Sequence, residues 1–148
     1  MKKCKFAGLM VLTMLAGPAL AACEIEVESN DAMKFNKSSI DVPQSCSQFV
    51  VKLKHVGKMP KTSMGHNWVL AKTADIQGVI KDGITAGLNN QYVKSGDARV
   101  IAHTKIIGGG ESDTATVDVG KLKAGEGYTF ICSFPGHSAI MKGTLQVK

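Results

Sequence analysis

Near its end the sequence reads Cys132-Ser133-Phe134-Pro135-Gly136-His137-Ser138-Ala139-Ile140-Met141. This stretch puts a thiol, an imidazole and a thioether on one short loop between two strand-like runs. A thiolate, imidazole nitrogens and a weak axial thioether form a trigonal site that suits copper in both of its oxidation states. The turn at Pro135 and Gly136 lets Cys132 and His137 face the same point, which a helix would not do at this spacing. The stretch therefore predicts one half of a copper site.

A second imidazole comes from Gly65-His66-Asn67-Trp68, which precedes an apolar run. The carbonyl of Gly65 can approach the metal as a distant axial contact, because glycine lets the backbone come close. A cysteine followed by a histidine is usually incidental when it stands alone, whereas the two stretches together are much more specific. The expected metal ligands are His66, Cys132, His137, Met141 and, as a weak axial carbonyl, Gly65.

Three stretches carry a further signal: Met64-Gly65-His66-Asn67-Trp68-Val69-Leu70, Arg99-Val100-Ile101-Ala102-His103-Thr104-Lys105 and Cys132-Ser133-Phe134-Pro135-Gly136-His137. They resemble the azurins, which are bacterial single-domain blue copper proteins. Four residues separate Cys132 from His137, as in azurins, whereas plastocyanin-like relatives have two. The resemblance implies an all-β, Greek-key β-sandwich of the cupredoxin type with one inserted α-helix. It also implies a non-enzymatic electron carrier that cycles one type 1 copper between Cu(I) and Cu(II) by outer-sphere transfer through the His137 edge.

The same resemblance assigns roles to residues around the metal. Asn67 braces the two ligand loops, and the backbone N–H groups of Asn67 and Phe134 donate to the Cys132 thiolate. An apolar patch for partners comprises Met33, Met59, Met64, Phe134, Pro135 and Gly136. The implied partners of this expected monomer are redox proteins such as c-type cytochromes, nitrite reductase or amine dehydrogenases. Ser63 stands where many azurins carry an apolar residue, which makes the patch smaller.

The cysteines allow two interpretations of Cys23. Azurins pair the cysteines that correspond to Cys23 and Cys46, and a disulfide suits an oxidising compartment. Leu20-Ala21-Ala22-Cys23 also resembles the box before the lipidated cysteine of bacterial lipoproteins, which would make Cys23 a membrane anchor. Lipidation would leave Cys46 without its partner, so the disulfide is favoured.

Residues 1–21 have the features of a secretory signal peptide. They begin with the basic run Lys2–Lys5, continue with the apolar stretch Phe6–Leu15 and end at the small-residue site Ala19-Leu20-Ala21. We therefore expect export to the periplasm and a single domain over residues 22–148. No later stretch approaches the roughly 20 apolar residues of a transmembrane helix, so stable membrane insertion is not expected.

The composition excludes nucleic-acid binding. The chain has 148 residues, of which 44% are hydrophobic, and this is enough apolar material for one core. The formal charge of +6 falls to +3 once Lys2, Lys3 and Lys5 leave with the leader. No basic run is interleaved with aromatic residues, as a nucleic-acid-binding surface would require.

Short strands separated by glycine-rich turns fill most of the chain, which favours a β-sandwich. The clearest alternation of apolar and polar residues runs over Phe49–His55. His55 lies on its apolar side and is expected to be a core-edge histidine with a backbone hydrogen bond, not a ligand. His103 is expected on the surface, also as a non-ligand. Trp68 is expected to fill the core.

One helix is predicted over residues 73–88, as an insertion between strands. Its expected docking face is a stripe that recurs every four residues: Ile76, Ile80, Ile84 and Leu88. Three glycines within this stretch weaken the helix by about 1 kcal/mol each relative to alanine, so it should be stable only when docked.

Two other functions stay open at the level of sequence. A copper buffer or chaperone would use the same ligands but would need facile metal exchange, which a closed four-ligand site resists. A Cys–His nucleophilic enzyme would need a third group that orients the histidine and a substrate cleft. Slow copper loss would argue against the buffer, and alkylation of Cys132 only in the metal-free form would argue for a metal site and against the enzyme.

Overall fold

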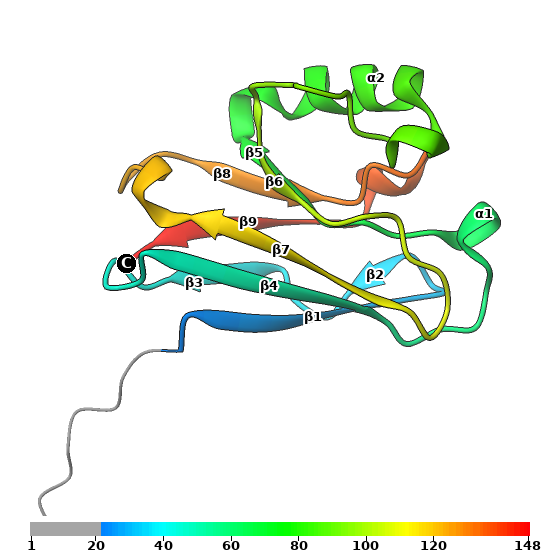
Figure 1. Ribbon diagram of the computed structural model, residues 1–148, viewed down its shortest axis with the longest axis horizontal. Coiled ribbons are helices and arrows are strands. Elements are labelled where there is room, and N and C mark those ends of the chain that lie inside the picture. The colour runs from blue at the N-terminus through cyan, green and yellow to red at the C-terminus, as the bar shows by residue number, and fades with distance from the viewer. Residues whose placement is uncertain (1–21) are drawn as a thin grey trace, which may run out of the picture.

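The computed structural model describes residues 22–148, and their strands form two facing β-sheets (Figure 1). The predicted signal peptide over residues 1–21 lies outside the described residues. The strands are β1 (Glu24–Asn30), β2 (Lys34–Phe35), β3 (Ser39–Val42), β4 (Gln48–His55), β5 (Val69–Lys72), β6 (Val100–His103), β7 (Ser112–Asp118), β8 (Tyr128–Ile131) and β9 (Lys142–Val147). The helices are α1 (Lys61–Met64) and α2 (Ile76–Ala86), with short 3₁₀ turns η1 (Thr73–Asp75), η2 (Leu88–Asn90), η3 (Val119–Lys121) and η4 (His137–Ala139).

The two sheets have the strand orders β2-β1-β4-β7 and β3-β9-β8-β5-β6. β1 runs parallel to β4, and β3 runs parallel to β9, whereas the other neighbouring strands are antiparallel. Most neighbours within a sheet are not consecutive in the chain, so the chain crosses repeatedly between the sheets. The predicted all-β sandwich with an inserted helix is confirmed.

Strand β4 shows how the sequence sets the sheet. Phe49, Val51, Leu53 and His55 are buried, and the residues between them are exposed or half-buried. This period of two places one row of side chains between the sheets and the other row in solvent. A slip of one residue would expose the whole apolar row, so the alternation fixes the register with β1 and β7.

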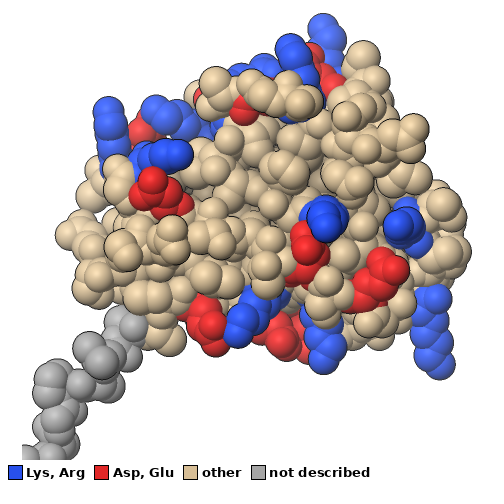
Figure 2. All heavy atoms as spheres, in the orientation of Figure 1, with Lys and Arg blue, Asp and Glu red and all other residues tan. Residues whose placement is uncertain are grey.

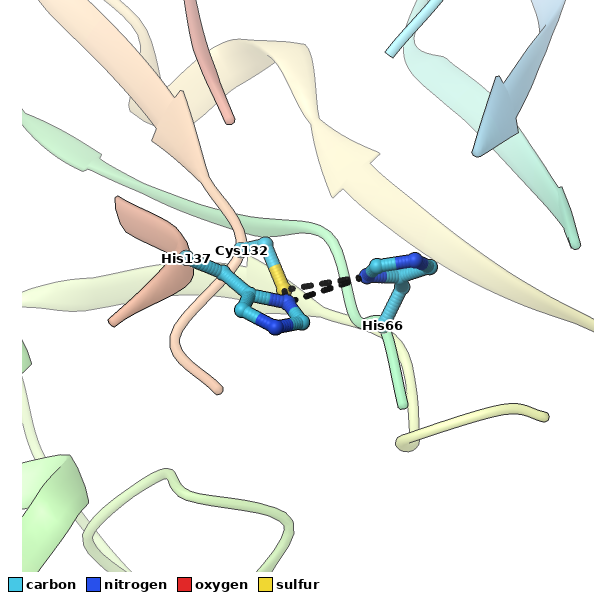
Figure 3. Close-up of side chains that lie close together, drawn as sticks. All are labelled: His66, Cys132 and His137. Carbon is cyan, nitrogen blue, oxygen red and sulfur yellow. Dashed lines mark hydrogen bonds between the residues drawn. The ribbon is translucent and has the colours of Figure 1, made fainter. Parts of the chain in front are cut away.

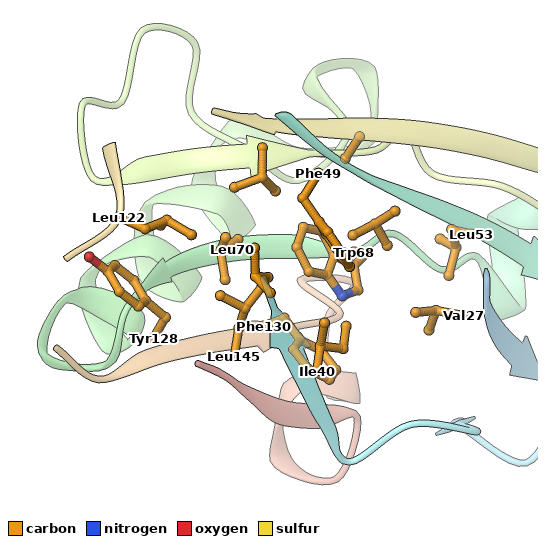
Figure 4. Close-up of a cluster of buried hydrophobic side chains, with 14 of the residues drawn as sticks. Val27, Ile40, Phe49, Leu53, Trp68, Leu70, Leu122, Tyr128, Phe130 and Leu145 are labelled. Atoms are coloured by element: carbon orange, nitrogen blue, oxygen red, sulfur yellow. The ribbon is translucent and has the colours of Figure 1, made fainter. Parts of the chain in front are cut away.

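Trp68 and Phe130 stack near the centre of the core, with ring centroids 5.6 Å apart (Figure 4). Trp68 is fully buried, as the sequence predicted. Its backbone N–H donates to the Thr104 hydroxyl at 2.9 Å. Because Trp68 directly follows His66 and Asn67, the core anchors the segment that carries the first predicted metal ligand.

A disulfide joins Cys23 to Cys46, which confirms the pairing expected from the resemblance. It ties the start of β1 to the segment before β4, and the Val50 N–H adds a hydrogen bond to the Cys23 carbonyl at 2.9 Å. A crosslink over this separation of 23 residues stabilises the fold by about 3 kcal/mol in the chain-entropy model. The bond also occupies the sulfur that the lipoprotein alternative would modify.

Helix α2 docks by a face that shares only part of the predicted stripe. Ile76 is buried and Ile80 is half-buried against the same cluster, together with Val79, whereas Ile84 is 48% exposed. The prediction was wrong for Ile84 because a spacing of four advances 400° around a helix of 3.6 residues per turn, so residues four apart drift off one face. Gly83 packs so close to the Tyr92 carbonyl that a Cβ there would overlap it.

The segment before His66 contains a second, very short helix. Helix α1 (Lys61–Met64) is a single turn, and Gly65 is its C-cap. A single turn is too short for hydrophobic periodicity to reveal. Gly65 lies so close to the Lys61 carbonyl and to Ile106 that a Cβ would overlap both, so the chain turns tightly before His66.

The docking face of α2 can be tested by two alanine substitutions. Val79→Ala should lower the free energy of unfolding by about 2 kcal/mol, because it removes buried methyl groups and leaves a cavity. Ile84→Ala should change it by less than about 0.5 kcal/mol, because that side chain is largely in solvent. Urea unfolding of both variants makes the comparison. An equal or larger loss for Ile84→Ala would contradict the observed orientation of the helix.

Candidate metal centre

Three buried side chains meet at one end of the sandwich (Figure 3). His66 precedes β5 and forms an isolated bridge with Ile107, Cys132 directly follows β8, and His137 begins η4. The Cys132 Sγ lies 3.8 Å from His66 Nδ1 and 3.7 Å from His137 Nδ1, and the two Nδ1 atoms are 3.2 Å apart. The sequence named all three residues, and the fold brings them together from positions up to 71 residues apart.

This triangle has the size of a metal site. A point equidistant from the three atoms lies about 2.1 Å from each of them, close to the bond lengths that imidazole nitrogen and thiolate sulfur make to such metals. One thiolate and two imidazoles form a trigonal donor set that suits copper. The residues present therefore fit a copper ion.

The protonation states leave the right lone pairs free. His66 Nε2 donates to the Asn30 carbonyl at 2.9 Å, so Nδ1 is the unprotonated nitrogen that faces the site. Burial lowers the pKa of His66 to about 4, and burial also lowers the pKa of His137. Burial raises the pKa of the Cys132 thiol to about 11, although backbone N–H groups of Asn67 and Phe134 act in the opposite direction.

The loop between Cys132 and Met141 is closed by its own backbone. The Cys132 N–H donates to the Met141 carbonyl at 3.0 Å, and the Met141 N–H donates to the His137 carbonyl at 2.8 Å. Gly136 has φ +84°, a left-handed conformation that glycine adopts without strain and that lets the loop reverse after Pro135. Met141 is fully buried at the end of this loop.

Gly65 lies on the other ligand segment, next to His66. Its carbonyl oxygen is 3.9 Å from the Cys132 Sγ. The predicted axial carbonyl is thus beside the three-atom cluster, and its position is fixed by the close packing of Gly65 against α1.

Asn67 links the two ligand segments. Its Oδ1 accepts the Ser133 N–H at 2.8 Å, and its Nδ2 donates to the Ser133 hydroxyl at 2.8 Å. Its Nδ2 also donates to the Gln91 carbonyl at 2.8 Å. Asn67 directly follows His66, and Ser133 directly follows Cys132. The two hydrogen bonds between Asn67 and Ser133 therefore fix the spacing of the two segments next to the metal donors.

Two residues of the long loop before β6 support the site, and the sequence analysis missed them. Gln91 and Tyr92 both have left-handed backbone conformations, with φ +60° and +52°, which non-glycine residues rarely adopt. The Tyr92 ring meets Phe134 edge to face at 5.3 Å, and Phe134 lies 4.6 Å from the His137 ring. No simple sequence signal marks a glutamine or tyrosine for such a conformation.

Two further histidines lie outside the triangle. His55 is buried, its Nε2 donates to the Met64 carbonyl at 3.0 Å and its Nδ1 accepts the Gly57 N–H at 3.0 Å. Its ring stacks on His66 at 4.6 Å, so it supports a predicted ligand without facing the cluster. His103 is exposed on β6.

The predicted patch residues lie in the turn between β1 and β2 (Met33), before and at the end of α1 (Met59 and Met64), and in the loop after β8 (Phe134, Pro135 and Gly136). Met59 is 39% exposed, Pro135 and Gly136 are exposed, and the others are half-buried: Met33, Met64 and Phe134. The loop before α1 is held by Asp31, whose carboxylate accepts the N–H groups of Lys58 and Met59.

Comparison with known proteins agrees with the geometry of the site. Residues 21–148 match the family described as "Copper binding proteins, plastocyanin/azurin family". The chain belongs to this family. Copper is therefore its cofactor, as predicted, and the family assigns it the role of a blue copper electron carrier, not an enzyme.

Individual family members are similar over nearly their whole length. Azurin of Bordetella pertussis is 59% identical over 141 residues, which cover 95% of this chain and 94% of that protein. Azurin of Achromobacter denitrificans is 62% identical over 139 residues, or 93% of each chain. The solved structure of an azurin (Az-iso2) from Methylomonas sp. strain J has a TM-score of 0.84 at 52% identity and covers 86% of this chain and 99% of that one.

Within residues 22–148, no helix is both long and apolar enough to cross a membrane.

The protonation states predict that metal binding releases one proton at pH 7. The Cys132 thiol, with its pKa near 11, still holds its proton at this pH, whereas both histidines are already neutral. Calorimetric titration of the metal-free protein with Zn²⁺, in two buffers of different protonation enthalpy, counts the protons. The release should fall towards zero in Cys132→Ser. Zero release from the unmodified protein would mean that the thiol is already ionised or does not bind.

Proposed function

We propose that this protein is a periplasmic electron carrier that passes single electrons between redox proteins through the edge of His137. His66, Cys132 and His137 would hold the copper, and Met141 and the Gly65 carbonyl would be its weaker contacts. The observation that carries the proposal is the buried triangle of one sulfur and two nitrogen atoms. Copper supplies a one-electron couple between Cu(I) and Cu(II) when it is bound there.

The chain contributes rigidity. His66 is anchored by the Asn30 carbonyl and by the core residue that follows Asn67, and Cys132 is anchored between β8 and the Met141 carbonyl. Donors that are held in place before the electron moves need little rearrangement when it moves, which keeps the barrier to transfer low. His66 and Cys132 are fully buried and exclude water from the donors.

The chain also tunes the sulfur. The backbone N–H groups of Asn67 and Phe134 act on the Cys132 thiol, and both favour the charged thiolate. Hydrogen bonds donated to the sulfur withdraw electron density from it. A sulfur with less electron density stabilises Cu(II) less, which raises the reduction potential of the copper.

His137 is the favoured exit because it is the least enclosed donor. It is 4% exposed, whereas His66 and Cys132 are fully buried. Its loop presents the exposed residues Pro135 and Gly136 to solvent. The apolar patch of Met33, Met59, Met64, Phe134, Pro135 and Gly136 would then form the contact with partners such as c-type cytochromes, nitrite reductase or amine dehydrogenases.

The leader supports the proposed location. The features of residues 1–21 are those of an export signal, and the Cys23–Cys46 disulfide is of the kind that persists in oxidising compartments such as the periplasm. After export, residues 22–148 would work as a monomer that meets its partners one at a time.

A copper buffer or chaperone is less compatible with this arrangement. Such a protein must release its metal readily, whereas these donors are buried and their two segments are joined by the Asn67–Ser133 hydrogen bonds.

The exit can be tested by placing a charge on the patch. Met64→Glu should leave the intense visible thiolate-to-copper band and the reversible one-electron couple of the copper-loaded protein intact. It should slow electron self-exchange at least about tenfold, since desolvating an unpaired charge at the contact costs more than about 1.4 kcal/mol. The rate is measured at high salt to screen the net charge.

Gln48→Glu is the matched control, because it adds the same charge at the start of β4, away from the site. It should exchange electrons at the rate of the unmodified protein. A Met64→Glu rate equal to this control would place the exit on another face. A protein without the visible band or a reversible couple would instead favour the buffer.

A further inference from the structure

Exposed lysines gather around the copper end of the molecule. They are Lys34, Lys58, Lys61, Lys105 and Lys142. Each lies close in the chain or in the sheet to a residue of the site: Lys34 pairs with Asn30 across β1 and β2, for example, and Lys142 follows Met141. Within residues 22–148 none of the five forms an ion pair. Figure 2 shows basic side chains projecting at the end of the molecule where α1 lies.

The carboxylates at this end are bonded to the backbone. Asp31 accepts the N–H groups of Lys58 and Met59 at 2.8 and 3.2 Å. Glu111 and Asp113 accept backbone N–H groups of neighbouring loop residues at 2.8 and 2.7 Å. The lysine ammonium groups, by contrast, have no such partners and extend into solvent.

Away from the five lysines, about half of the basic residues of the described chain form ion pairs, among them Lys52–Glu24 at 2.7 Å, Lys72–Glu126 at 2.6 Å and Lys148–Asp41 at 2.8 Å. The others in this part of the chain, which include Lys121 and Lys123, have no ion pair. Lys121 and Lys123 are exposed near the turn between β7 and β8, at the opposite end of the sandwich. These two lysines provide a matched comparison for the copper end.

The centre of the copper end is apolar. Ile140 is 59% exposed and Met59 is 39% exposed, and these are among the largest exposed apolar side chains of the described residues. The Ile140 N–H donates to the His137 carbonyl at 3.1 Å, so this side chain, which the sequence analysis did not include in the patch, lies next to the proposed exit.

From this charge distribution we infer that the partner of this protein docks with an acidic face, in which carboxylates surround an apolar contact. This inference rests on the proposed exit at His137. An apolar contact alone excludes water but gives little orientation, whereas charges around its rim steer the encounter and raise its rate at low salt. The five lysines outnumber the carboxylates of Asp31, Glu111 and Asp113, which keep their negative charge, so the lysines on several sides of the patch match a ring of acidic groups on the partner.

Two double variants separate the effect of charge at the copper end from the effect of the protein's net charge. Lys58→Glu with Lys61→Glu, and Lys121→Glu with Lys123→Glu, change the total charge by the same amount at opposite ends. The reduced copper protein gives one electron to hexacyanoferrate(III) or to tris(phenanthroline)cobalt(III), which yields Cu(II) and the reduced complex. The first variant should react at least tenfold more slowly with the anion and faster with the cation. The second should change both rates much less, and all differences should shrink at high salt.

Equal effects of the two variants would overturn the inference, because net charge alone would then explain them. The visible band and the potential must first be shown to be unchanged in both variants. If the unmodified protein lacks the reversible one-electron couple, the proposed function is refuted instead. If Met64→Glu exchanges electrons as fast as the Gln48→Glu control, only the proposed exit at His137 is refuted.

A protein probe tests docking without copper. Plant-type ferredoxin, an acidic one-electron protein, should shift the amide NMR signals of residues 58–64 and 134–142 when it is added to the metal-free chain at low salt. The shifts should be lost in the Lys58→Glu, Lys61→Glu variant and kept in the Lys121→Glu, Lys123→Glu variant. Shifts centred on the far end, or shifts that survive in the first variant, would contradict an acidic partner at the copper end.

Discussion

The two hydrogen bonds between the Asn67 carboxamide and Ser133 fix the distance between the segments that carry the copper donors. Each residue directly follows a donor residue, His66 in one case and Cys132 in the other. Both are buried, and a buried polar pair with its partners satisfied is rigid because no water competes for its bonds. The third bond of the carboxamide, to the Gln91 carbonyl, extends this support to the loop before β6.

This rigidity has an energetic consequence in the metal-free chain. The two Nδ1 atoms that face each other at 3.2 Å include the unprotonated lone pair of His66, and the neighbouring thiol is buried with them. In the metal-free chain these buried polar atoms have one another as hydrogen-bond partners. Burial makes it costly to ionise them, which raises the pKa of the Cys132 thiol and lowers the pKa values of both histidines. Copper would be held by the same three atoms.

Much of the metal site and of strand β4 could be predicted from the sequence. The spacing of Cys132, His137 and Met141 around Pro135 and Gly136 predicted the ligand loop, because residue types and turn chemistry are local properties. The alternation over Phe49–His55 predicted β4 and its buried face for the same reason. The failures concern geometry that only the assembled fold decides. A spacing of four predicted Ile76 correctly but also pointed to Ile84, whereas Val79 packs with Ile76 against the sheet. The left-handed conformations of Gln91 and Tyr92 follow from long-range contacts with Asn67, Ile106 and Phe134, which no local pattern encodes.

X-ray absorption at the copper edge, in the oxidised and the reduced protein, tests the central claim that the fold holds the donors in place. The account predicts one sulfur and two nitrogen neighbours at roughly 2 Å in both oxidation states, with distances that change by less than about 0.2 Å when the electron is added. Loss of a nitrogen neighbour on reduction, or absence of the sulfur in the oxidised protein, would contradict it.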